Sequence, residues 1–231
     1  HQVRGCCPHV AAVSHSTHVQ GHLDVVRMLA DLGADVIKLE PPQGDLLRGL
    51  VEIPDGPDPW WELDNRGKRG IVVDLTTKQG RQVAHKIAAS CDVVVTNLTM
   101  ERQSKFELTD VDLRENHPEL IHVTLTGYGN NGPDQDRLAF DYTAFFSRGG
   151  VLNTIGEPGN TPPNPRPGQG DHTTSLAILS SILLALRERD LTGEGQAAID
   201  RATPVWQAAQ AALVEKFGEE RWRRMIEDMA E

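Results

Sequence analysis

The sequence is short of cysteine, of basic residues and of long apolar runs. Three cysteines in 231 residues, two of them adjacent at Cys6 and Cys7, do not make a disulfide framework, which favours a reducing, cytoplasmic environment. The 23 Lys and Arg residues are outnumbered by 33 Asp and Glu, and the net charge of −10 argues against a general nucleic-acid binder. No apolar run approaches the roughly 20 residues of a membrane span, so we expect no membrane partner.

Short apolar runs alternate with amphipathic segments along the first half of the chain. We expect strands at 35–39, 70–75, 92–96 and 120–125, and helices at 23–32, 77–89 and 108–116. This βαβ alternation predicts a parallel sheet with right-handed crossovers. The run at 92–96 is continuously apolar, as expected for a strand that is covered on both faces.

The second half of the chain begins with a long loop. Residues 153–170 are rich in Pro, Gly and Asn, and a helix is expected at 173–189, followed by a turn at 192–196 and a possible strand at 196–200. Residues 205–229 read as one or two amphipathic helices. We therefore expect an α/β fold, a Rossmann-like parallel sheet flanked by helices over residues 1–200, with a helical C-terminal segment over residues 201–231.

A Gly-Gln-Gly turn places the carboxylate of Asp171 just ahead of a small and apolar segment. Glycines let the backbone approach a ligand closely, and the dipole of a following helix favours an ionised acid. A well-held, ionised carboxylate is a possible covalent nucleophile, although an Asp N-cap is the simpler interpretation of the same pattern.

Other motifs carry less information. Gly127–Gly132 matches the dinucleotide pattern GxGxxG, but Pro133 follows it directly and no apolar helix does, which argues against nicotinamide binding. His15, His18 and His22 could share a helix face, but no second cluster completes a metal site, so we expect no metal. No GxSxG elbow supports a serine hydrolase.

Taken together, several segments resemble the class III CoA-transferases, which include formyl-CoA and carnitine CoA-transferases. These segments occur in family order across residues 18–200. They are His18–Gln20, Leu29–Glu40 with Gly44–Asp45, Asn65–Arg69, Asp92–Asn97, Thr126–Gly129, Gly132–Pro133, Gly170–Asp171 and Thr192–Gln196.

The resemblance implies a function and a site. In the family, the Asp that follows this glycine attacks an acyl-CoA thioester and becomes an aspartyl-CoA thioester, from which a carboxylic acid collects the CoA. Asp171 and Gln20 are then the catalytic residues. By matching segments or by position at a strand end, the residues expected to bind CoA are His18, Val19, Lys68, Arg69, Asn97, Leu98, Lys105 and Thr126. The resemblance further implies no permanently bound cofactor, acyl-CoA and a small carboxylic acid as substrates, and a homodimer at full length.

The chain also departs from the family pattern. Gly-Pro is missing after Gln20, residues 1–17 do not show the apolar strand expected before the first helix, and the chain ends at Glu231, short of a family member. A 2-methylacyl-CoA racemase of the same fold would need a His where Phe140 stands. The alternatives to a CoA-transferase are therefore such a racemase or an inactive CoA-binding fragment.

Overall fold

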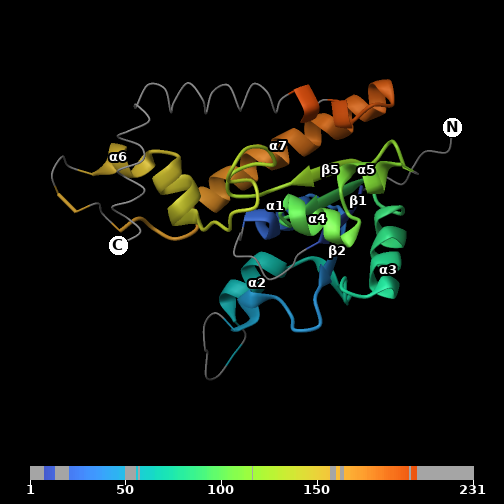
Figure 1. The fold of residues 1–231 in the computed structure, drawn as a ribbon, viewed down its shortest axis with the longest axis horizontal. Helices are drawn as coiled ribbons and strands as arrows, with labels where there is room; N and C mark the ends of the chain where they lie inside the picture. The colour runs from blue at the N-terminus through green and yellow to red at the C-terminus, as the bar shows by residue number, and fades with distance from the viewer. Residues whose placement is uncertain are drawn as a thin grey trace.

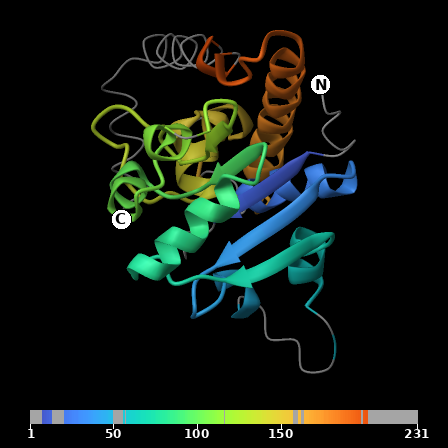
Figure 2. The same cartoon turned by 90° about the vertical axis from the view of Figure 1, so that its right-hand side faces the viewer.

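The computed structural model describes residues 8–13, 21–49, 56, 58–115, 117–156, 160–161, 164–197 and 199–201. Its centre is a five-stranded parallel sheet with the strand order β3-β2-β1-β4-β5 (Figures 1 and 2). The strands are β1 His9–Val13, β2 Asp35–Glu40, β3 Lys68–Val72, β4 Val93–Thr96 and β5 Ile121–Thr124. The predicted α/β fold with a Rossmann-like parallel sheet is confirmed.

Helices cover both faces of the sheet. One core joins the sheet to α1 Gly21–Asp31 and α7 Gln169–Thr192 through residues such as Val26 and Ile182. The other core joins it to α3 Lys78–Ala88, α4 Met100–Phe106 and α5 Asp110–Arg114. In Figure 2, α3 crosses in front of the strands and α1 lies behind them. Alternate residues of β1, β2 and β4 enter opposite cores, so these three strands carry apolar side chains on both faces, whereas the edge strand β3 is mostly exposed.

Shorter elements complete the described chain. They are the 3₁₀ helix η1 Leu46–Gly49, α2 Pro59–Asn65, the π-helix η2 Tyr142–Arg148 and α6 Val151–Ile155. None of the described helices combines the length and the apolarity that a bilayer crossing requires. Helix starts follow ordinary capping chemistry: Thr77 caps α3 by accepting the Gly80 N–H, and Thr109 and Asp112 form a capping box at α5.

Two expectations from the sequence are wrong. Residues 1–17 do contain a strand, and β1 is the centre of the sheet, paired with β2 on one side and β4 on the other. Its four buried residues, 10–13, are only Val and Ala, a run too short and too small to stand out, and pairing on both sides compensates for that.

The possible strand at 196–200 is helical at its described residues. The side chain of Gln196 contacts the outer edge of β5: its oxygen accepts the backbone N–H of His122 at 2.9 Å. Its amide donates to Asp200, one helical turn on, at 3.1 Å. The loop expected at 153–170 overlaps the end of α6 and the start of α7. The helices expected at 205–229, and the segment 201–231 apart from its first residue, lie outside the described residues.

Candidate functional site

The order of the strands marks one edge of the sheet as the place for a ligand. The chain runs outward from β1 in both directions, so the crevice between β1 and β4 is the topological switch point. The carboxyl ends of these strands lie together, because Val13 pairs with Thr96. In open α/β sheets, ligands bind just beyond that point.

Asp171 lies at this edge, and not in front of its helix as expected. It is the third residue of α7, whose N-cap is Gly168 with a φ of 79°. The N-terminus of α1 packs directly against it: a Cβ added to Gly21 would lie 3.4 Å from Asp171 Oδ1 and 3.1 Å from the side chain of Leu125, just after β5. The Gly21 N–H faces the Asp171 carboxylate. A side chain at position 21 would therefore need Leu125 or Asp171 to move by a few tenths of an ångström.

The charge state expected for Asp171 needs correction. Burial raises the pKa of its carboxyl from 3.8 to about 7, and the nearby Asp141 adds to the effect. The Gly21 N–H lowers the pKa but does not offset burial. The helix dipole was expected to keep Asp171 ionised, but burial and a second carboxylate outweigh it and raise the pKa into the neutral range.

Asp141 is the second carboxylate of the site. It precedes the π-helix η2, and its carboxylate faces the backbone N–H groups of Gly168, Gly170 and Asp171 at the start of α7. Neither oxygen completes a hydrogen bond of normal geometry, and burial raises the pKa of Asp141 on balance. A Cβ at Gly170 would overlap Asp141 Oδ1 and the ring of Phe145. The glycine before Asp171 is therefore required by packing against η2.

Three of the predicted CoA-binding residues lie at the carboxyl edge. Asn97 and Leu98 follow β4 and are buried, and Thr126 follows β5 with a buried hydroxyl that has no hydrogen-bond partner among the described residues. Lys105 is exposed on the last turn of α4, the helix that starts from the same edge. His18, Val19 and Gln20, between β1 and α1, lie outside the described residues.

The backbones of Lys68 and Arg69 do not lie at the carboxyl edge of the sheet. They open β3, at the amino ends of the strands. The Lys68 ammonium donates to the backbone oxygens of Leu23 and Asp64, and burial lowers its pKa to about 7. Arg69 forms a bidentate pair with Asp35 at 2.6 and 2.9 Å. Both cations already have partners within the protein, and the structure does not bring Arg69 to the ligand edge.

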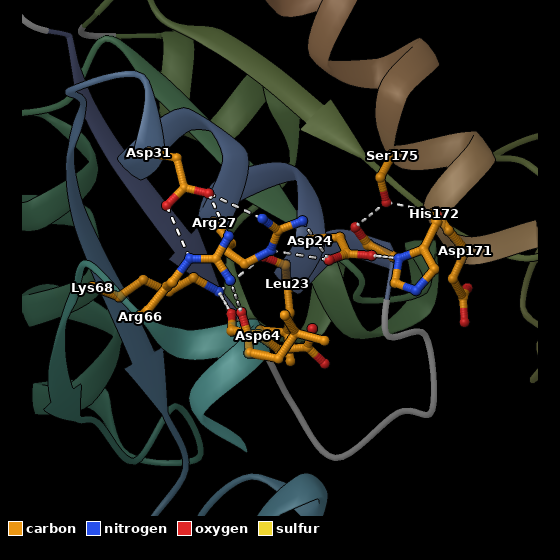
Figure 3. Close-up of polar contacts among 12 residues, drawn as sticks. Leu23, Asp24, Arg27, Asp31, Asp64, Arg66, Lys68, Asp171, His172 and Ser175 are labelled. Atoms are coloured by element: carbon orange, nitrogen blue, oxygen red, sulfur yellow. Dashed lines mark hydrogen bonds and ion pairs between the residues drawn. The ribbon is translucent and has the colours of Figure 1, made fainter. Parts of the chain in front are cut away.

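Two residues that the sequence analysis did not single out, Gln103 and Asp24, make contacts close to the same edge. The buried Gln103 donates to the Leu98 carbonyl at 2.8 Å and so fixes the turn after β4. Asp24, on the first turn of α1, contacts His172 of α7 (Figure 3). Asp24 did carry a signal, since a charged residue there interrupts an otherwise apolar run from Leu23 to Val26.

The GxGxxG segment does not have the local structure of a dinucleotide-binding turn. No helix follows it directly within the described residues, and Gly129 and Gly132 occupy open turns at φ of 81° and 101°. Gly127 instead packs against Ala139.

Comparison with known proteins identifies the family. The sequence model of CoA-transferase family III matches residues 14–224. The chain belongs to CoA-transferase family III. This family III chain is 38% identical over 175 residues to (R)-2-hydroxy-4-methylpentanoate CoA-transferase of Clostridioides difficile, covering 74% of this chain and 44% of that protein. It is 39% identical over 174 residues to cinnamoyl-CoA:phenyllactate CoA-transferase of Clostridium sporogenes, covering 73% of this chain and 42% of that protein.

Solved structures agree with the family assignment. The crystal structure of Rv3272 from M. tuberculosis superposes with a TM-score of 0.71 at 27% identity, covering 88% of this chain and 59% of that one. A CAIB/BAIF family protein from Brucella suis superposes with a TM-score of 0.68 at 30% identity, covering 80% of this chain and 50% of that one. The family III chain thus spans less than half the length of the curated relatives named above.

Proposed function

We propose that the protein transfers coenzyme A from an acyl-CoA to a carboxylic acid through an aspartyl-CoA thioester on Asp171. The observation that carries the proposal is the position of this carboxylate, which is part-buried at the edge where strands β1, β4 and β5 end and is faced by the Gly21 N–H. Membership of CoA-transferase family III supports the same chemistry.

The proposed reaction passes the activated acyl bond from thioester to anhydride and back to thioester, and each bond that forms replaces one that breaks. An Asp171 oxygen attacks the thioester carbonyl, the C–S bond breaks, and CoA thiolate leaves a mixed anhydride. The thiolate attacks the aspartyl carbon, which releases the donor carboxylate and forms aspartyl-CoA. The acceptor carboxylate repeats the two exchanges in reverse and regenerates Asp171. Splitting the transfer in this way replaces one difficult step by exchanges between species of similar energy.

The electrostatics of the site suit this role. A carboxylate attacks only when ionised, and with a pKa of about 7 Asp171 is present in both forms at neutral pH. Partial burial removes water that would otherwise stabilise the anion, so the ionised form is more reactive than an exposed carboxylate. We expect the rate of adduct formation to rise with pH and to level off above about pH 7.

Placement supports part of the proposed CoA site. Asn97, Leu98 and Thr126 line the carboxyl edge, and Lys105 on α4 is the exposed cation that we assign to a CoA phosphate. His18, Val19 and Gln20 belong to the proposal through the family resemblance. For Lys68 and Arg69 the protein partners described above leave the resemblance as the sole support.

The remaining parts of the proposal concern the acceptor and the cellular setting. The two relatives named above act, by name, on 2-hydroxy-4-methylpentanoate and phenyllactate, so 2-hydroxy acids are the first acceptors to test. We also propose a cytoplasmic protein, from its few cysteines, and a homodimer at full length, from the family resemblance.

Mass spectrometry tests the central claim. The protein that carries this chain is mixed with acyl-CoA and then digested. We expect a CoA-sized adduct on Asp171 that is absent from Asp171→Ala. Protein that binds CoA without forming an adduct would favour the inactive CoA-binding alternative. Uptake of α-deuterium from deuterated water without an acceptor acid would favour the racemase, although Phe140 offers no group to move that proton.

A further inference from the structure

His172, the residue after the proposed nucleophile, bridges the two helices of the site. Its Nδ1 contacts Asp24 Oδ2 across the interface between α7 and α1 (Figure 3). Asp24 is 1% exposed, whereas about half of the His172 side chain is exposed. The contact therefore joins a buried carboxylate on α1 to a half-exposed ring beside Asp171.

The partners of Asp24 define which atom donates. Its other oxygen, Oδ1, accepts from Arg27 Nε at 3.2 Å and Nη2 at 3.1 Å. A carboxylate held by a guanidinium is ionised and only accepts hydrogen bonds, so the proton of the His172 contact belongs to Nδ1. The other ring nitrogen, Nε2, lies toward Gly168, where an added Cβ would be 3.4 Å away.

A second contact ties the same two turns. Ser175 follows His172 by three residues, so both lie on the same side of α7. Its hydroxyl lies 2.8 Å from the Gly21 carbonyl and 2.6 Å from the carbonyl of Asp171. Ser175 thus contacts the first residue of α1, and His172 contacts its fourth. The Gly21 N–H that faces Asp171 is placed by this turn of α1.

We propose that His172 is a positioning residue, whose Nδ1–H bond to Asp24 fixes the first turn of α1 against α7 and so holds the Gly21 N–H on the Asp171 carboxylate. The inference rests on the proposed function of Asp171. Ser175 and His172 add one polar contact at each end of the first turn of α1 to the apolar packing of α1 against α7, and the His172–Asp24 bond is the one that fixes the fourth residue of α1. Small displacements of a reacting group have large effects on rate.

The test compares two substitutions of the ring. His172→Asn carries an amide N–H close to the position of Nδ1 and keeps the donor, whereas His172→Ala removes it. Thr173→Ala is the matched control, because within the described residues its hydroxyl bonds the Gln169 carbonyl of its own helix and makes no bond to α1. We expect His172→Ala to slow formation of the Asp171–CoA adduct about tenfold, with CoA affinity changed less than about twofold, and His172→Asn to recover most of the rate.

A structural readout accompanies the rate. Amide hydrogen exchange of peptides that cover residues 21–31 should be faster in His172→Ala than in His172→Asn or Thr173→Ala. Equal exchange and equal adduct rates in all three variants would overturn the proposal, and so would a His172→Asn rate as low as that of His172→Ala. Should the unsubstituted protein form no adduct, the proposed function fails, while hydrogen exchange still decides whether His172 positions α1.

Discussion

The Asp171→Asn protein should be more stable than the unsubstituted protein, by an amount that grows as the pH rises. The folded protein holds the Asp171 proton up to about pH 7, because burial raises the pKa of the carboxyl, whereas the unfolded chain loses it near 3.8. Between these values the folded state binds the extra proton, so the stability of the unsubstituted protein falls as pH increases through this window. Asn does not titrate, so the Asp171→Asn protein lacks this loss.

The pKa change fixes the size of the effect. Raising a carboxyl pKa from 3.8 to about 7 corresponds to about 4 kcal/mol above pH 7 for a group shielded from water. Asp171 is only part-buried, so screening by solvent reduces this to about 2 kcal/mol. About half of that loss is already complete at pH 5, so we expect the stability advantage of Asn to grow by about 1 kcal/mol between pH 5 and pH 8.

Urea unfolding at pH 5 and pH 8 measures this growth. Asn also changes the contact with the Gly21 N–H, but that contribution is the same at both pH values and cancels in the comparison. Thr173→Ala, on the same turn of α7, removes no titratable group and should run parallel to the unsubstituted protein. A stability difference between Asn and Asp that is equal at the two pH values would refute the claim that the fold holds the Asp171 proton.

Three further outcomes follow from the same geometry. Gly170→Ala should lower the free energy of unfolding by about 2 kcal/mol or more, because the added methyl group would overlap Asp141 and Phe145. Gly70→Ala is the control, since nothing lies within 4 Å of its added methyl group. Similar losses of stability in both variants would contradict the overlap. Gln103→Leu leaves the buried Leu98 carbonyl without its donor and should lose about 1–3 kcal/mol in thermal or urea unfolding. Removing the charge of Lys105 should weaken CoA binding measured by calorimetry and flatten its salt dependence.

The sequence predicted the layered fold but not its central strand. The apolar runs at 35–39 and 92–96 were long enough to identify, and both lie within a residue of β2 and β4. β1 was missed because it owes its stability to pairing on both sides, which a local pattern does not contain. The position of the switch point, and hence of the ligand edge, depends on that missed strand.

The candidate site shows the same division between local and tertiary information. The motif around Asp171 located the carboxylate, but the dipole argument considered only its own helix, whereas Asp141 arrives from a segment thirty residues earlier. Lys68 and Arg69 are neighbours in the motif. In a strand, successive side chains point to opposite faces, so one lies beneath α1 and the other pairs with Asp35. Spacing in the motif gave no indication of these partners.

Three carboxylates gather where α1 and α7 begin, and their partners differ in a way that bears on the proposed role of Asp171. Asp24 is held by Arg27 and His172, and Asp141 faces three backbone N–H groups at the start of α7. Asp171 is faced by the Gly21 N–H and by the negative charges of the other two. Because burial and the other two carboxylates disfavour its ionised form, Asp171 would gain from forming a covalent bond that removes the charge. In the proposed mechanism, the other two acids would raise the nucleophilicity of Asp171 without themselves touching the substrate.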